Sequence, residues 1–66
     1  MTPETFVRKL AKFGYTPHNA HELLGVGRRS VFRYASGDTE VPEIVIRLLR
    51  MYELHGVPAD IRKDGA

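Results

Sequence analysis

The sequence lacks cysteine altogether and has no long apolar run. Without cysteine, no disulfide or thiolate metal site can support the fold, and nothing points to an oxidising compartment. A membrane-spanning helix needs about 20 consecutive apolar residues, so we expect no transmembrane segment. The first residues, MTPETF, carry no positive segment followed by an apolar stretch, so we expect no secretory signal. Together these absences favour a cytoplasmic protein.

Residue patterns for catalysis or metal binding are also missing. Ser30 and Ser36 have no candidate histidine–carboxylate relay, and no glycine-rich phosphate loop follows a strand. His18, His21 and Glu22 have helical spacing, but no further set of metal ligands with matching spacing accompanies them. We therefore expect neither an enzyme nor a metal, cofactor or small-molecule site. His21 is interpreted as a partly buried packing residue.

Positive charge is concentrated in the first half of the chain, although the net charge is only +2. Residues 8–33 contain six basic residues and one acidic residue, whereas residues 34–66 contain four basic and six acidic residues. The basic residues of the first half are Arg8, Lys9, Lys12, Arg28, Arg29 and Arg33. The first half is therefore a candidate for binding a polyanion, and the second half is not.

The 66 residues are enough for one domain with a small core, since a chain of this size buries only about 60% of its unfolded surface. Prolines and threonines at helix starts and glycines at helix ends predict four helices, over residues 3–13, 17–24, 28–36 and 42–55. No window alternates apolar and polar residues, so no sheet is expected. We predict an all-α bundle of four helices, with five as the alternative. Residues 1–56 would form this domain and residues 57–66 a flexible C-terminal tail.

Residues 16–37 have the arrangement of a helix-turn-helix unit. A short helix ends at Gly25, about three residues turn the chain, and a second short helix follows. Glycine permits the left-handed backbone that sets the two axes at a steep angle, and Val26 and Val31 would fill that angle. In this motif the second helix enters the DNA major groove and its first residues meet base edges.

The stretch LLGVGRRSVFRYASG resembles the phage repressor and Cro family, with matches at Leu24, Gly25, Val26, Val31, Tyr34 and Gly37. The similarity covers about residues 3–55, with Gly27 in place of the usual Ser or Thr cap. It implies a lambda-repressor-like fold and a sequence-specific, double-stranded DNA-binding transcriptional regulator. The family resemblance further implies a homodimeric repressor that reads an inverted repeat through its third helix. In scale, the chain resembles regulators of phages and mobile elements, which act at the nucleoid.

The resemblance implies base contacts from the third helix, at Arg28, Arg29 and Arg33. Their spacing agrees, because positions 29 and 33 are one turn apart and lie opposite Val31 and Tyr34. Phe32 flanks this side and is a candidate contact to a thymine methyl group. Contacts to the DNA backbone are expected near helix ends, beside the arginines and from the basic first helix: Thr16, His18, Ser30, Ser36 and Lys12.

The helix predicted over residues 42–55 is apolar nearly all round, apart from a stripe containing Glu43, Arg47 and Arg50. A surface helix normally has one apolar face, so three short helices would not cover this one. We predict that one flank forms a two-fold dimer interface, consisting of Ile46, Leu49, Tyr52 and Leu54. Alternatively, the bundle wraps this helix more fully. Two other functions stay open: an antitoxin-like subunit that binds another protein through this helix, and an RNA-binding protein.

Overall fold

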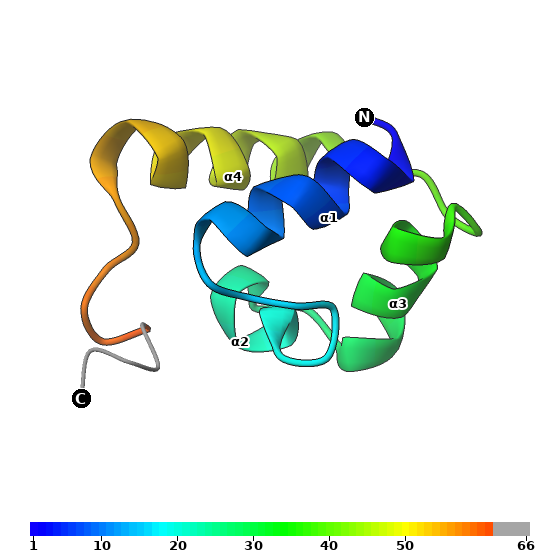
Figure 1. The fold of residues 1–66 in the computed structure, drawn as a ribbon, viewed down its shortest axis with the longest axis horizontal. Helices are drawn as coiled ribbons and strands as arrows, with labels where there is room; N and C mark the ends of the chain where they lie inside the picture. Colours follow the sequence, from blue (N-terminus) through cyan, green and yellow to red (C-terminus); the bar gives the residue numbers. More distant parts are fainter. Residues whose placement is uncertain (62–66) are drawn as a thin grey trace.

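The computed structural model describes residues 1–61, and within this range the chain is helical with no strand. Four helices follow one another: α1 Pro3–Lys12, α2 Ala20–Leu24, α3 Arg28–Ser36 and α4 Glu43–His55 (Figure 1). The predicted all-α fold is therefore confirmed, with four helices rather than five in the described part of the chain. None of these helices is long and apolar enough to cross a membrane.

Most helix boundaries follow the predicted signals. Thr2 caps α1 with its hydroxyl oxygen, which accepts a hydrogen bond of 3.1 Å from the Thr5 N–H. α3 ends at Gly37, whose left-handed φ of +84° lets the chain leave the helix. α4 begins at Glu43, one residue later than predicted, because Pro42 occupies the capping position with an extended backbone.

α2 is shorter than predicted. Residues 17–19 form a turn, and Asn19 rather than Thr16 is the capping residue. The Asn19 side-chain oxygen accepts a hydrogen bond of 2.8 Å from the Thr16 N–H, which closes the turn. The helix then runs from Ala20 to the left-handed Gly25, whose φ is +71°. A helix this short depends on its neighbours for stability.

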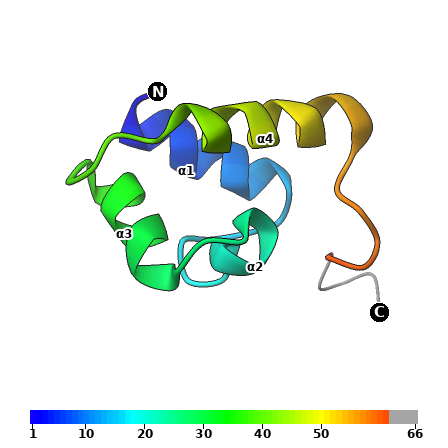
Figure 2. The ribbon, with the colours of Figure 1, turned by 180° about the vertical axis from the view of Figure 1, so that it is seen from behind.

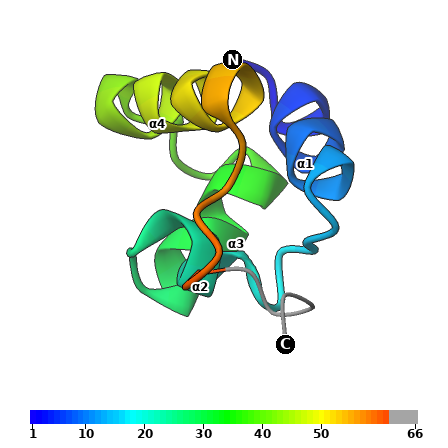
Figure 3. The ribbon, with the colours of Figure 1, turned by 90° about the vertical axis from the view of Figure 1, so that its left-hand side faces the viewer.

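The helices form two layers. α1 and α4 lie side by side in one layer, with α2 and α3 in the other, as the three views in Figures 1, 2 and 3 show. Apolar side chains from both layers meet in the core, where the most buried large ones are Phe6, Leu10, Leu23, Val31 and Leu49. Phe6 and Tyr34 pack edge to face, with ring centroids 5.8 Å apart, and so join α1 to α3.

Tyr52 fastens α4 to the other layer. Its hydroxyl donates a buried hydrogen bond of 2.8 Å to the carbonyl oxygen of Leu23, near the end of α2. Carbonyl groups in the last turn of a helix have no partner inside the helix, so this bond satisfies an otherwise unpaired buried group. Burial also raises the pKa of the Tyr52 hydroxyl, with further contributions from Tyr15 and Asp60.

Two residues predicted at a dimer interface belong to this core instead. Leu49 is fully buried and Tyr52 is only 8% exposed within the single chain, so neither is available to a partner. Ile46 is partly buried against the core, whereas Leu54 is 71% exposed. α4 is therefore rotated about its axis relative to the prediction, so that Leu49 and Tyr52 face the core. Because α4 is apolar nearly all round, its sequence does not determine which side faces the body.

Residues 57–61, the first half of the predicted C-terminal tail, lie against the domain. Val57 and Ile61 are partly buried and pack on the core. The Tyr15 hydroxyl donates a hydrogen bond of 3.1 Å to the Ile61 carbonyl oxygen. The remainder of the predicted tail, residues 62–66, lies outside the described residues.

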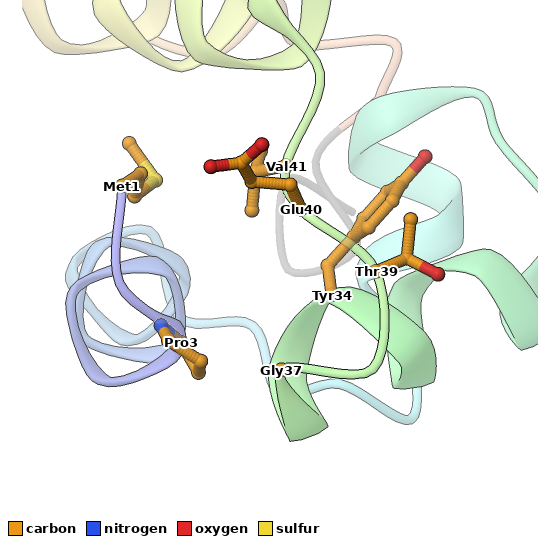
Figure 4. Close-up of a pocket in the computed structure, with 7 residues that line it drawn as sticks. All are labelled: Met1, Pro3, Tyr34, Gly37, Thr39, Glu40 and Val41. Carbon is orange, nitrogen blue, oxygen red and sulfur yellow. The ribbon is translucent and has the colours of Figure 1, made fainter.

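The end of α3 lies directly on the first turn of α1. A β-carbon at Gly37 would come within 3.1 Å of Pro3 Cγ (Figure 4). This position favours glycine because a side chain would be crowded there and because the backbone is left-handed. This contact and the Phe6–Tyr34 pair both hold α3 against α1, which fixes the side that α3 turns outward.

We expect Tyr52→Phe to lower the free energy of unfolding by about 1–3 kcal/mol, because the Leu23 carbonyl would stay buried without a partner. Urea denaturation followed by circular dichroism measures this change. Tyr15→Phe is the matched control, since it removes the less buried hydrogen bond to Ile61, and it should cost less. Wild-type stability of Tyr52→Phe would contradict the assigned role of this bond.

Candidate nucleic-acid interface

One side of α3 carries exposed arginines and the other side carries core residues. Arg28, Arg29 and Arg33 are exposed, whereas Val31 and Tyr34 are buried. Positions 29 and 33 are one helical turn apart, so these two side chains leave the helix in similar directions. We call the exposed surface the arginine face, which consists of Arg28, Arg29, Phe32 and Arg33.

The arginine face keeps most of its positive charge. Within residues 1–61, Asp38 is the only carboxylate within ion-pair distance of it, with Oδ2 at 4.0 Å from Arg33 Nε. These side chains are 57% (Arg33) and 72% (Asp38) exposed, so water screens the contact and it contributes little. Arg28 and Arg29 have no such pairing in the described part of the chain. Their guanidinium groups are open to an external anion.

The first turn of α3 adds backbone donors beside this surface. Gly27 caps the helix without a side-chain hydrogen bond, and its carbonyl accepts from the Val31 N–H at 3.2 Å. The backbone N–H groups of residues 28–30 precede this bond and have no acceptor inside the helix. They lie at the start of α3, where the helix dipole favours an anion. A β-carbon added at Gly27 would meet nothing within 4 Å, so a phosphate group has room to approach.

The loop before α2 contacts the arginine face through Phe32. The Phe32 ring packs edge-on against the ring of His18, with centroids 5.1 Å apart and an interplanar angle of 81°. Both residues are exposed, and Phe32 takes no part in the core. The structure thus brings together residues predicted for base and backbone contacts from two separate segments.

The three hydroxyl groups predicted to contact a DNA backbone differ in their availability. Thr16 Oγ1 accepts a hydrogen bond of 3.3 Å from the His18 N–H, so its own proton can still be donated. Ser36 already donates to the Arg33 carbonyl at 3.2 Å, at the C-terminal end of α3 where the helix dipole disfavours an anion. Ser30 is partly buried. The geometry therefore favours Thr16 over Ser36 and Ser30.

Lys12 does not join the arginine face. It is the last residue of α1, and that end of the helix lies away from α3 (Figures 1 and 2). The Nζ atoms of Lys9 and Lys12 lie 2.6 Å and 3.8 Å from Oε2 of Glu53 on α4. The hydrogen bond from Lys9 lowers the pKa of Glu53, and the charges of both lysines act in the same direction. These lysines connect α1 to α4.

Arg8 belongs to the basic first half of the chain and, with the two lysines that follow it in α1, is a weaker sequence-based candidate for contacts to flanking DNA backbone. It lines a shallow hollow with Val7, Ala35 and Ser36, beside the end of α3. Glu4 lines the same hollow and offsets part of its charge. Arg8 reaches this place because α1 packs against α3, and no local sequence pattern encodes that crossing.

His21 is half-buried in α2, in agreement with the packing role that was predicted for it. Its Nδ1 atom is buried without a hydrogen-bond partner within the described chain, and its Nε2 atom lies 4.0 Å from Glu22 Oε2. Among residues 1–61, no group of three His, Cys, Asp or Glu side chains could hold a metal ion.

Two of the hollows outside the arginine face differ in their lining residues. One, of about 380 Å³, is lined by the chain start, α3 and the loop leading into α4: Met1, Pro3, Tyr34, Gly37, Thr39, Glu40 and Val41 (Figure 4). The other is apolar and lies between α4 and the α2–α3 turn. We call it the hinge groove, which is lined by Leu24, Gly25, Val26, Ile44, Val45, Arg47, Leu48 and Met51.

Comparisons of this chain with protein-family models, with curated proteins and with solved structures find no match. The resemblance to the phage repressor and Cro family therefore stays a prediction, carried by the residues of α2, α3 and the turn between them.

We expect Arg8→Ala to weaken binding to every duplex DNA, because Arg8 lies beside α3. Lys12→Ala should leave binding nearly unchanged, because Lys12 lies away from α3 and close to Glu53. Fluorescence anisotropy titrations at several salt concentrations measure both variants, and each lost phosphate contact should reduce the salt slope by about one. Equal losses in the two variants would contradict the placement of Arg8.

Proposed function

We propose that this chain is a sequence-specific double-stranded DNA-binding protein, a transcriptional regulator that inserts α3 into the major groove. The observation that supports the proposal is the arginine face, in which exposed guanidinium groups stand on a helix whose other side is anchored in the core. The major groove of B-DNA is about 12 Å wide and admits an α-helix. Its guanine edges accept the two parallel hydrogen bonds that arginine donates.

The proposed roles of the residues follow their positions. Arg28, at the first position of α3, enters the groove beside the backbone donors of the helix start. Arg29 and Arg33 share one shallow hollow with Phe32 and read base edges. Thr16 and Arg8 would contact flanking phosphates, which position the protein but carry no sequence information.

Repression is the regulatory action that this mode of binding supports. A protein bound across a promoter blocks its use by occupancy alone, and this needs no site other than the DNA-binding surface. The proposed location is on the DNA of the nucleoid.

Arg29→Ala and Arg33→Ala should each reduce discrimination between the preferred duplex and a scrambled one by about 1–3 kcal/mol, because each removes a base contact. Thermal unfolding should stay unchanged, since both side chains are exposed. Competition binding and circular dichroism melting measure the two effects. Arg50→Ala, an exposed arginine on α4, is the matched control and should keep wild-type discrimination. Unaltered discrimination in both α3 variants would rule out this reading surface.

A protein-interaction module is the second candidate function, favoured by the exposed apolar residues of α4, Ile44, Met51 and Leu54. The salt dependence of binding separates the two functions. A DNA-binding protein that makes about six phosphate contacts should show a slope near −5 in a plot of log affinity against log salt. A flat response, or equal affinity for unrelated duplexes, would favour the interaction module. Duplex RNA is disfavoured because its major groove is too deep and narrow for side chains to read.

We further propose that the regulator is a homodimer joined through the hinge groove. Ile44 and Met51 protrude from α4 at the edge of the groove, where they are 76% and 57% exposed. A two-fold interface uses the same patch on both copies, so the patch must be complementary to itself, and protrusions beside a hollow meet this requirement. The hinge groove and these two side chains provide both in one place.

The charges at the groove are compatible with a second copy. Arg47 lines the groove, and its Nε donates to Glu43 Oε2 at 3.2 Å, so the approaching copy meets an ion pair rather than a lone positive charge. The groove also adjoins the turn that leads into α3. A partner seated there would lie near the start of the proposed DNA-binding helix, so pairing would determine the spacing of the two α3 helices.

We expect Met51→Glu to shift the protein from dimer to monomer, because it would bury a charge at the proposed interface. Sedimentation at micromolar concentration measures the change. Leu54→Glu is the matched control: Leu54 is also exposed on α4 but lies outside the groove, so its variant should stay dimeric. A monomeric wild-type protein, with and without DNA, would contradict the proposed dimer. Dissociation by Leu54→Glu alone would move the interface away from the groove, toward the C-terminal end of α4.

A further inference from the structure

Phe32 differs from every other exposed large apolar residue in the described part of the chain. The others, Ile44, Met51 and Leu54, all lie on α4, whereas Phe32 stands among the arginines of α3. It is 38% exposed and does not pack into the core. A partner that covers the exposed part of the ring would gain the free energy of burying that apolar surface.

His18 holds this ring from one side. The edge-on contact between the two rings has a centroid distance of 5.1 Å. His18 is itself part of the turn that Asn19 closes through its hydrogen bond to the Thr16 N–H, and its own N–H donates to Thr16 Oγ1. These hydrogen bonds hold the backbone of the turn, from which the imidazole reaches Phe32. A ring that is already positioned loses less side-chain freedom on binding.

Arg29, Phe32 and Arg33 line one shallow hollow on the outer side of α3. Phe32 follows Arg29 by three positions, so the two side chains are neighbours on the helix surface. A guanidinium group beside an apolar ring matches two neighbouring base edges in the major groove. The guanidinium fits the O6 and N7 acceptors of guanine, and the ring fits the 5-methyl group of thymine.

On the basis of the proposed DNA-binding function, we propose that Phe32 reads the methyl group of a thymine directly beside the guanine that Arg29 reads. Phe32 is the specificity-determining residue of this contact. His18 is a positioning residue that acts through Phe32. The preferred DNA site then contains neighbouring thymine and guanine bases in each half-site.

Replacing thymine by deoxyuridine tests the contact, because the exchange removes only the methyl group. The duplex is first selected from a random pool with the wild-type protein, and each thymine is then replaced singly. At one thymine per half-site, wild-type affinity should fall about fourfold, as expected for loss of one methyl-sized apolar contact. In Phe32→Ala, the thymine and uracil duplexes should bind equally well.

One control variant and two variants of His18 complete the experiment. Leu54→Ala removes an exposed apolar residue of α4 that lies outside the hinge groove, and it should keep the wild-type ratio of thymine to uracil affinity. His18→Ala should lower this ratio, and His18→Phe, which keeps an aromatic ring against Phe32, should restore it. A merely structural role of His18 would change the affinities for both duplexes by the same factor and leave the ratio at its wild-type value.

Two results overturn the inference while leaving DNA binding intact. One is a selected duplex in which every thymine tolerates uracil, and the other is a Phe32→Ala variant with the wild-type ratio. Circular dichroism confirms that each variant is folded, and Phe32→Leu, which keeps an apolar side chain, should retain part of the ratio. A pool in which no sequence is enriched would overturn the proposed function and this inference together.

Discussion

The buried hydrogen bond from Tyr52 to the Leu23 carbonyl is the contact on which the arrangement of the helices depends. α2 has only five residues, which is too short for a stable helix on its own. The bond fixes its last turn to α4 immediately before the left-handed Gly25, so it also fixes where the chain turns into α3. In a domain with such a small core, one buried contact of this kind is a sizeable part of a marginal stability.

α3 and α4 present different surfaces because the side chains that they leave outside the core differ in kind. α3 is held by buried Val31 and Tyr34, which leaves its arginines facing outward as a cationic surface. α4 buries Val45, Leu49 and Tyr52, and its remaining apolar side chains, partly buried to fully exposed, continue around the helix into the hinge groove. One surface suits a polyanion and the other suits an apolar partner. The proposed dimeric regulator would use both, because pairing of two copies would place two α3 helices on one duplex.

Local signals explain why much of this fold could be predicted from sequence. Thr2 and Gly37 mark helix ends through interactions within a few residues, so α1 and α3 were placed correctly. The predicted start of α2 was wrong although Thr16 and Pro17 repeat the pattern at Thr2, because the Asn19 side chain accepts a hydrogen bond from the Thr16 N–H and closes a turn, so the helix begins only after Asn19. That competition depends on one side-chain hydrogen bond, which the pattern of residue types does not reveal.

In the candidate site, too, some placements follow from local sequence and others depend on how distant helices pack. The exposure of Arg29 and Arg33 follows from their spacing relative to Val31, which is local. The placements of Lys12 near Glu53 and of Arg8 beside α3 depend on how helices cross, and so does the burial of Leu49. Sequence periodicity gives the apolar side of a helix only when the helix has a polar side, and α4 has too little polar surface to set its rotation.

Selection of bound duplexes from a random pool tests most directly whether α3 reads duplex DNA through its arginines. We expect enrichment of half-sites containing guanine, arranged as an inverted repeat with centres about one helical turn (~10 bp) apart. A pool that stays random after selection would contradict it. So would the same enriched sequence appearing when both Arg29 and Arg33 are replaced by alanine.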